Sequence, residues 1–204
     1  MKISAHNLSK RFGPRPIFKN ISFEAEPKSA LAITGPNGSG KSTLLKVLNG
    51  LVIPNSGKVE FTKDGSALNR EQIRPLIAYV TPEMNLYEEL SGWENLRFFL
   101  QVSARSKTAP EYENALEQVG LKGRGDDFVK GYSSGMKMRL KYALAILLEP
   151  SILFLDEPTT NLDNAGKEMV YALMKKQVEN NILIYATNEK DELQFAHAQI
   201  KLDK

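Results

Sequence analysis

One glycine-rich segment has the residue types and the spacing of a phosphate-binding loop. Residues 35–43 read GPNGSGKST, which fits the pattern G-x-x-x-x-G-K-[ST]. Glycines let such a loop wrap around an anion, so that successive backbone N–H groups point at phosphate oxygens. The lysine supplies a positive charge to the β- and γ-phosphates, and the next hydroxyl is a ligand for Mg²⁺. We expect phosphate contacts from Gly35, Pro36, Asn37, Gly38, Ser39, Gly40, Lys41, Ser42 and Thr43.

Two adjacent carboxylates follow an apolar stretch later in the chain. Residues 152–155 read ILFL, the composition of a buried strand, and Asp156 and Glu157 come directly after it. Sites in α/β proteins lie at the carboxyl ends of strands, and neighbouring strand residues point to opposite faces. The two acids can therefore do different jobs. We expect Asp156 to serve Mg²⁺ together with Ser42, and Glu157 to be the general base that orients an attacking water.

Short strands and helices that alternate along the chain must position these residues. Strand patterns occur at 29–34, 57–62, 76–80, 151–155 and 182–186, and helical patterns occur at 42–48, 136–148 and 166–178. The stretch after Pro82 is helical in composition, with capping boxes at Ser91 and Thr108. Alternating strands and helices predict an α/β fold with a largely parallel sheet. We expect one domain, with a core of residues 1–81 and 151–204 that includes an N-terminal antiparallel β subdomain, and a helical lobe inserted at 82–150.

Composition excludes several kinds of chemistry. The 204 residues contain no cysteine, which rules out disulfides, thiolate metal sites and a cysteine nucleophile. Lys and Arg number 27 against 24 Asp and Glu, a net charge of +3 spread along the chain, so we expect no nucleic-acid partner. The apolar runs are too short to cross a bilayer. We expect a cytoplasmic chain, or one that is peripheral on the inner face of the cell membrane.

A third segment connects these motifs. Residues 132–136, YSSGM, lie just before the predicted helix at 136–148 and upstream of the acidic strand. Here the chain resembles the ATP-binding cassette (ABC) ATPases. In that family an adenine-stacking aromatic, the phosphate loop, a Gln loop, an L-S-G-G-Q signature, the acidic strand, a D loop and a switch histidine follow in this order. The resemblance runs from Leu8 to about Leu193 and implies a phosphate-loop NTPase cassette.

The resemblance implies further site residues. Phe12 is similar to the adenine-stacking aromatic, and Asn161, Leu162 and Asp163 are similar to the D loop of the dimer interface. In the family two cassettes pack head to tail, so that each ATP lies between the phosphate loop of one and the signature of the other. Residues that would meet the partner's nucleotide are Ser133, Ser134 and Gly135. The implied cofactors are ATP and Mg²⁺, and the implied partners are a membrane permease and a second cassette, like or unlike this one.

Two positions depart from the family. Pro82 occupies the place of the Gln-loop glutamine, so only Glu83 beside it can reach Mg²⁺; the alternative is that Glu83 is a solvated acid. Asn188 occupies the place of the switch histidine. Asparagine can donate a hydrogen bond to the γ-phosphate or position the attacking water, but it carries no charge and relays no proton. We assign Asn188 a catalytic role beside Glu157 and expect turnover to be slow.

These observations lead to one principal function and two rivals. The principal one is an ATP-hydrolysing subunit that powers a separate permease, similar to the short exporter type, including haem-exporter-like chains. The first rival binds ATP but hydrolyses it poorly, as the regulatory or structural half of a heterodimer. The second is a soluble ABC protein that acts on nucleic acid or ribosomes. Aromatic residues between Tyr87 and Phe99 would receive the permease, with Trp93 the member expected to be exposed. The alternative is that Phe98 and Phe99 fill the small core of the lobe.

Overall fold

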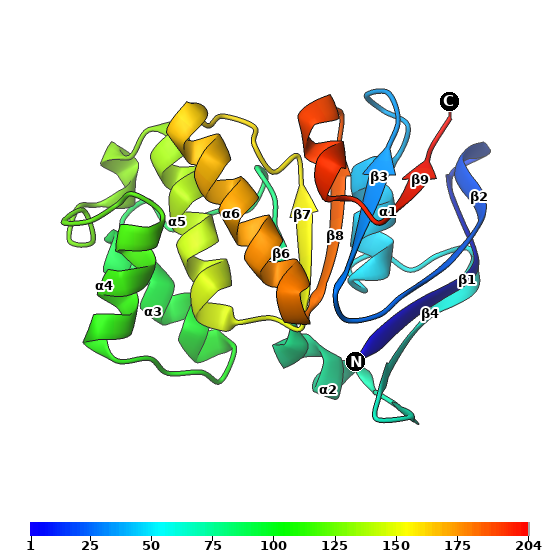
Figure 1. Cartoon of the computed structure of the whole chain (residues 1–204), viewed down its shortest axis with the longest axis horizontal. Helices are drawn as coiled ribbons and strands as arrows, with labels where there is room; N and C mark the ends of the chain where they lie inside the picture. The colour runs from blue at the N-terminus through cyan, green and yellow to red at the C-terminus, as the bar shows by residue number, and fades with distance from the viewer. Residues whose placement is uncertain (204) are drawn as a thin grey trace.

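Five strands form a parallel sheet at the centre of the molecule (Figure 1). The computed structural model describes residues 1–203. The strands lie in the order β6 (Ile77–Val80), β7 (Ile152–Asp156), β8 (Ile182–Thr187), β3 (Ser29–Thr34) and β9 (Ala198–Lys201). All neighbouring pairs are parallel, so every strand ends at the same edge of the sheet. This edge is at the top of Figure 1.

The central strands are apolar throughout because both faces of the sheet are covered. In β3, Leu31 and Ile33 join one hydrophobic cluster, whereas Ala30 and Ala32 join the other. The same alternation sorts the residues of β7 and β8 between the two clusters. The period of two that defines a strand thus divides each apolar run between two cores.

An antiparallel sheet and one helix cover the first face. The sheet order is β2 (Arg15–Ala25), β1 (Lys2–Phe12), β4 (Ser56–Lys63) and β5 (Ser66–Ala67), and the helix is α1 (Lys41–Leu48). Ile3, Leu8 and Phe61 from this sheet pack in one cluster with Leu44 and Leu48 of α1. Strand β3, which precedes the glycine-rich loop, is therefore packed against both the helix and the second sheet.

Helices α5 (Ser134–Leu148) and α6 (Asn164–Asn180) pack on the other face, and α3 (Gly92–Val102) and α4 (Ala109–Gln118) pack on α5 (Figure 1). Leu96 and Leu116 of α3 and α4 belong to the same cluster as Leu153 and Leu183 of the sheet. The remaining short elements are α2 (Arg70–Ile73) and the 3₁₀ segments Arg74–Leu76, Val129–Gly131 and Lys190–Phe195.

The expected α/β cassette architecture is confirmed, with small changes at its boundaries. The predicted strand at 29–34 has the observed bounds, and both capping boxes are present, at Ser91 with Glu94 and at Thr108 with Glu111. Helix α5 starts two residues before the predicted Met136, because the hydroxyl of Ser133 caps it by accepting the N–H of Met136.

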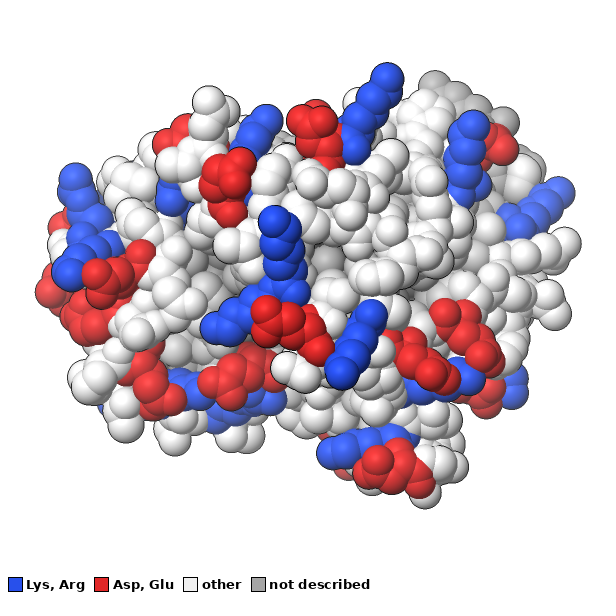
Figure 2. Space-filling view, viewed as in Figure 1, with Lys and Arg blue, Asp and Glu red and all other residues white. Residues whose placement is uncertain are grey.

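The surface mixes both signs of charge. Figure 2 shows acidic and basic side chains interspersed over one face, and several are paired, such as Lys107 with Glu149 at 2.8 Å. Within residues 1–203, no helix combines the length and the apolar character that crossing a bilayer requires.

The continuity of the lobe core with the sheet core has a consequence for unfolding. Leu100 of α3 is fully buried in the shared cluster, so we expect Leu100→Ala to cost about 2–5 kcal/mol of unfolding free energy. Fluorescence of Trp93, the only tryptophan, monitors the lobe, and far-UV circular dichroism monitors the whole chain. The urea midpoints measured with the two probes should fall by the same amount in this variant. A shift of the fluorescence transition alone would show that the lobe unfolds as a separate unit.

Candidate nucleotide-binding site

The glycine-rich segment forms the connection between β3 and α1. Gly35 and Gly40, at its two ends, have φ angles of 145° and 101°, which L side chains rarely adopt. A Cβ at Gly35 would collide with the backbone carbonyl of Leu202, and a Cβ at Gly40 would collide with the side chain of Ile17. Only glycine fits at both positions. Pro36, Asn37 and Gly38 between them are exposed, so the backbone of the loop is open to a ligand.

Lys41 is the first residue of α1 and is 5% exposed. Its Nζ donates to the carbonyl oxygens of Gly35 at 2.8 Å and of Pro36 at 3.3 Å, so the side chain folds back over the loop. Burial lowers the pKa of Lys41, and the nearby carboxylates of Glu157 and Asp156 oppose that shift. An anion in the loop would be a stronger acceptor for this ammonium than the two carbonyl groups.

Asp156 is the last residue of β7 and is 4% exposed. Its Oδ2 accepts a hydrogen bond of 3.0 Å from the hydroxyl of Tyr79 on β6, whereas its buried Oδ1 has no partner. Burial raises the pKa of Asp156, although the hydroxyls of Ser42 and Tyr79 act in the opposite direction. A buried carboxylate oxygen without a partner, next to a serine hydroxyl, is a donor set suited to Mg²⁺.

Glu157 does not continue strand β7. The sequence predicts that it does, because neighbouring strand residues point to opposite faces. Its φ angle is 48°, in the left-handed region, and its N–H donates to the carbonyl of Ala186 at the end of β8. The hydroxyl of Thr160 donates to Glu157 Oε2 at 3.3 Å. The two carboxylates are separated by a sharp turn rather than by the pleat of a strand. Strained backbone of this kind occurs often at functional sites.

Asn188 lies at the same edge of the sheet, directly after β8. Its Nδ2 donates to Oδ1 of Asn37 in the glycine-rich loop. Parallel pairing of β3 with β8 places Thr34 beside Thr187, and this register brings the two loops together. The structure thus gathers the glycine-rich loop, Lys41, Asp156, Glu157 and Asn188 at one edge.

Glu83 is placed differently from the other predicted metal ligands. Its Oε2 lies 2.8 Å from Nζ of Lys46 on α1, and its side chain is 72% exposed. Its N–H donates to the hydroxyl of Thr81, which keeps the turn after β6 tight. Within residues 1–203, no cluster of three or more His, Asp or Glu side chains is arranged to hold a metal ion. Any cation here would need ligands from the nucleotide and from water.

The signature and D-loop residues pack against each other. A Cβ at Gly135 would lie 3.1 Å from the carbonyl oxygen of Asn161, so the two segments are in close contact. Asp163 caps α6 by accepting the N–H of Gly166 at 2.8 Å, and it pairs with Arg139 of α5 at 2.6 Å. Ser133 and Ser134 are exposed. In Figure 1, α5 and α6 begin at the edge where β3 and β7 end, but α5 stands away from β3.

Three aromatic side chains form a cluster on the lobe, in which Tyr87 and Phe98 are exposed and Phe99 is half-buried against the core. Tyr87 contacts Phe98 and Phe99, with ring centroids 4.8 and 5.9 Å apart. Tyr87 and Phe98 are 49% and 37% exposed. The expectation that Trp93 is the exposed member is wrong, because its ring packs on Tyr112 at 5.0 Å and over Gly125.

Phe12, the predicted adenine-stacking residue, lies at the end of β1 and is 56% exposed. Nζ of Lys10 lies 5.0 Å from the centre of its ring. The exposed ring faces no other aromatic side chain within residues 1–203, so it is open to stacking with a planar ligand.

Two residues of the site were not found from the sequence. Tyr79 reads only as a strand residue, and its contact with Asp156 depends on the pairing of β6 with β7. Glu192 is fully buried, and its Oε1 accepts a hydrogen bond of 2.6 Å from the hydroxyl of Thr159. Burial raises the pKa of Glu192. Its surroundings in the sequence, KDELQ, are typical of an exposed helix, so no local pattern marks it.

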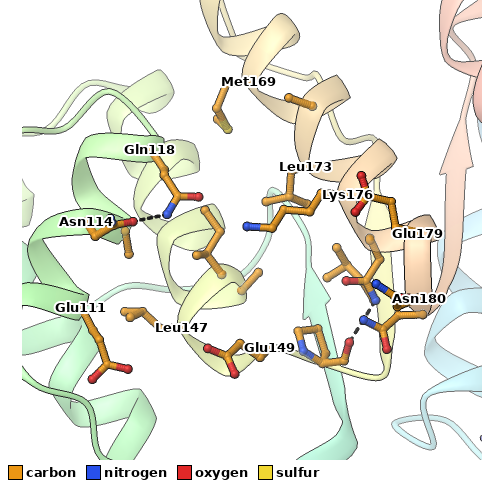
Figure 3. A pocket seen from close by; sticks show the side chains of 18 of the residues that line it. Glu111, Asn114, Gln118, Leu147, Glu149, Met169, Leu173, Lys176, Glu179 and Asn180 are labelled. Atoms are coloured by element: carbon orange, nitrogen blue, oxygen red, sulfur yellow. Dashed lines mark hydrogen bonds between the residues drawn. The ribbon is translucent and has the colours of Figure 1, made fainter.

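A hollow between α4, α5 and α6 lies away from this edge. It has a volume of about 870 Å³ and is bounded by α4, α5 and α6, with Leu147 and Leu173 on its floor (Figure 3). Lys176 and Glu111 reach over its rim, and Asn114 and Gln118 are joined to each other by a hydrogen bond. None of the predicted site residues lines it.

Comparison with known proteins decides the family. The family described as ABC transporter matches residues 18–160. The chain belongs to this family. The ABC transporter ATP-binding protein YdbJ of Bacillus subtilis is 36% identical over 184 residues, which make up 89% of this chain but 59% of YdbJ. This ABC chain therefore spans about three fifths of the length of that relative.

One further relative and one solved structure match this ABC chain almost from end to end. The cytochrome c biogenesis ATP-binding export protein CcmA of Vibrio vulnificus is 30% identical over 189 residues, which cover 93% of this chain and 92% of CcmA. A dimeric ATP-binding cassette in a post-hydrolysis state, bound to ADP and Pi, has a TM-score of 0.86 and 24% identity. The match covers 98% of this chain and 94% of the chain in that structure. The cassette fold is the same.

Asp156 gives a prediction for the nucleotide-free protein. Its pKa is raised in the folded state, so stability is lost as pH rises through the range above the ordinary value of 3.8. Asp156→Asn removes this loss and should raise the thermal midpoint at pH 7 by about 2–4 °C, equivalent to roughly 1 kcal/mol. The gain should shrink as the pH falls toward 3.8, because a growing fraction of the wild-type carboxyl is then protonated. Circular dichroism without nucleotide or Mg²⁺ measures it.

A matched control uses a carboxylate with the opposite shift. Hydrogen bonds from the N–H of Gly166 and from Arg139 lower the pKa of Asp163. Asp163→Asn should therefore not raise the midpoint at pH 7. An equal gain in both variants, or no gain in Asp156→Asn, would contradict the attribution to a buried unpaired charge.

Proposed function

We propose that this chain binds Mg²⁺-ATP, hydrolyses it, and powers a separate membrane permease as the ATP-binding subunit of an exporter. The observation that carries the proposal is the meeting of Lys41, Asp156, Glu157 and Asn188 around one glycine-rich loop at one sheet edge. We propose that residues 1–81 and 151–204 act as the nucleotide-binding core and that residues 82–150 act as the coupling lobe. The printed name of CcmA, an ATP-binding export protein, supports export.

Nucleotide binding uses groups that are already in place. Phosphate oxygens accept from backbone N–H groups of the loop, which Pro36 lacks, and from Lys41, whose ammonium leaves the carbonyl groups of Gly35 and Pro36. The exposed ring of Phe12 stacks on the adenine. Asp156 and Ser42 would hold Mg²⁺, which when bound would neutralise charge on the phosphates. Glu83 reaches that ion only if its ion pair with Lys46 opens.

Hydrolysis requires a base beside the γ-phosphate. Glu157 takes a proton from water while the water oxygen bonds to the γ-phosphorus, and the bond from that phosphorus to the bridging oxygen of ADP breaks. Asn188, held at the loop by Asn37, donates a hydrogen bond to the γ-phosphate. Because the amide carries no charge, this step is slower than one assisted by a histidine.

Two cassettes are needed to complete each site. Ser133, Ser134 and Gly135 begin a helix of 15 residues, and its N-terminal N–H groups are suited to a phosphate. No hydrogen bond within residues 1–203 joins them to the glycine-rich loop, but both segments lie along one edge. We assign them, with the D loop Asn161–Asp163, to the nucleotide of a second cassette. The dimeric cassette of the same fold supports this arrangement.

The permease contact is assigned to the aromatic cluster of Tyr87, Phe98 and Phe99. Exposed aromatic side chains that pack on one another are typical anchors of protein interfaces. Tyr87 follows the turn at Pro82–Glu83 by only a few residues, so a movement of the permease is passed to the end of β6. The chain would then be peripheral on the inner face of the membrane through that partner.

A second candidate function is favoured by the departures at Pro82 and Asn188. A cassette that lacks both the glutamine and the histidine side chains could bind ATP and hold a heterodimer closed without turning it over. Glu157, the base of the proposed reaction, is retained, and this favours hydrolysis.

Phosphate release from ATP by the purified chain tests the proposal. Release should require Mg²⁺, rise faster than linearly with protein concentration, and vanish in Glu157→Gln. Glu189→Gln, which changes a neighbouring acid outside the proposed machinery, is the matched control and should retain turnover. ATP binding without release at any concentration would favour the second candidate function.

Asn188→His tests the assignment at the switch position. A charged donor to the transferring phosphate should raise kcat, by up to about 10²-fold given the contribution of one such donor. Asn37→Ala, which removes the partner of Asn188, should lower kcat while ATP still binds. An unchanged or lower kcat in Asn188→His would show that the site depends on asparagine itself.

A further inference from the structure

Backbone carbonyl groups of the turn after β6 are hydrogen-bonded to α5, the helix that begins with the signature residues. Thr81 is buried, and Pro82 provides no side-chain donor or acceptor. The backbone oxygens of both residues accept hydrogen bonds from Nζ of Lys141 on α5, at 3.1 and 2.7 Å. The turn itself is closed by the N–H of Met84, which donates to Thr81 at 3.1 Å.

Lys141 is an unusual residue for this position. It is only 6% exposed, and lysine is almost never buried without a charged partner. Within residues 1–203 it forms no ion pair, and burial together with Lys137 lowers its pKa. A buried ammonium whose only acceptors are two carbonyl groups is costly. Its two hydrogen bonds offset part of this cost, and they tie the turn to α5.

Lys141 and the turn that it contacts are each connected to residues of the proposed site. Helix α5 begins with the signature residues Ser133–Gly135, and Lys141 lies two turns further along it. Tyr79, two residues before Thr81, donates its hydroxyl to Asp156. The chain of contacts runs from the signature helix through Lys141 and the turn to the carboxylate assigned to Mg²⁺. A hollow of about 210 Å³ adjoins it, bounded by Pro82, Lys137, Lys141 and Asn161.

We infer that Lys141 is a positioning residue of the ATPase cycle, which makes the turn at residues 81–84 move together with the signature helix. The contact joins the turn to the signature helix through backbone oxygens, which Pro82 retains although it has no polar side chain. This inference rests on the proposed function for its kinetic consequence. The mechanical part, a turn held by Lys141, stands on the contacts alone.

Amide hydrogen exchange in the nucleotide-free protein tests the mechanical part. Lys141→Met keeps the length and burial of the side chain but removes the donors. Exchange at residues 83–86 should become at least about tenfold faster, while exchange in β7 stays unchanged. Lys137→Met is the matched control: it lies one turn earlier on α5, lines the same hollow and pairs at the surface with Glu88 at 2.5 Å. It should leave residues 83–86 unchanged.

Kinetics test the functional part. Lys141→Met should lower kcat about tenfold with KM for ATP within twofold of wild type, and Lys141→Arg, which retains donors, should lie closer to wild type. Wild-type exchange and wild-type kcat in Lys141→Met would overturn the inference, as would equal effects of Lys137→Met. If the wild-type chain shows no hydrolysis, the proposed function fails, while the exchange result still decides whether Lys141 holds the turn.

Discussion

Parallel pairing of β3, β8 and β7 is the constraint on which the site depends. Because all three strands run in one direction, their ends bring the glycine-rich loop, the turn at Glu157 and Asn188 to one edge. Residues more than 150 positions apart, such as Asn37 and Asn188, come into hydrogen-bonding contact there. The two hydrophobic clusters hold this register, because a slip by one residue would exchange every side chain between the two faces.

The sequence predicts the parts of this arrangement that depend on local pattern. The apolar run at 29–34, the glycine spacing at 35–40 and the caps at Ser91 and Thr108 each contain the information that decides their structure. Asp156 could be placed because a buried strand must deliver its last residue to the sheet edge. The family followed from the order of several motifs, none of which was sufficient alone.

Long-range contacts decide the rest. The left-handed turn at Glu157 depends on a hydrogen bond to Ala186 of another strand, and the ion pair of Glu83 depends on Lys46 of α1. Trp93 is covered because Gly125, far along the chain, leaves room for its ring. The helical pattern alone would place Lys141 on a polar face. In the structure it is buried under a turn that lies 60 residues earlier in the chain. No local periodicity encodes such contacts.

Buried charges connect stability with activity in this cassette. Lys41, Asp156 and Lys141 are each at least nine-tenths buried, and burial shifts the pKa of each toward the neutral form. A chain optimised only for folding would avoid all three. In the proposed cycle, nucleotide and cation supply the missing partners of Lys41 and Asp156, whereas Lys141 fixes the turn between the lobe and the core.

The central claim is that one nucleotide joins two cassettes through the phosphate loop of one and the signature of the other. Sedimentation velocity of Glu157→Gln tests it most directly, because this variant should hold ATP unhydrolysed. With Mg²⁺-ATP the sedimenting mass should double from the 22.8 kDa of one chain, and without nucleotide it should not. Adding Ser133→Arg should abolish the dimer while ATP still binds. A monomer saturated with ATP at high protein concentration would contradict the account.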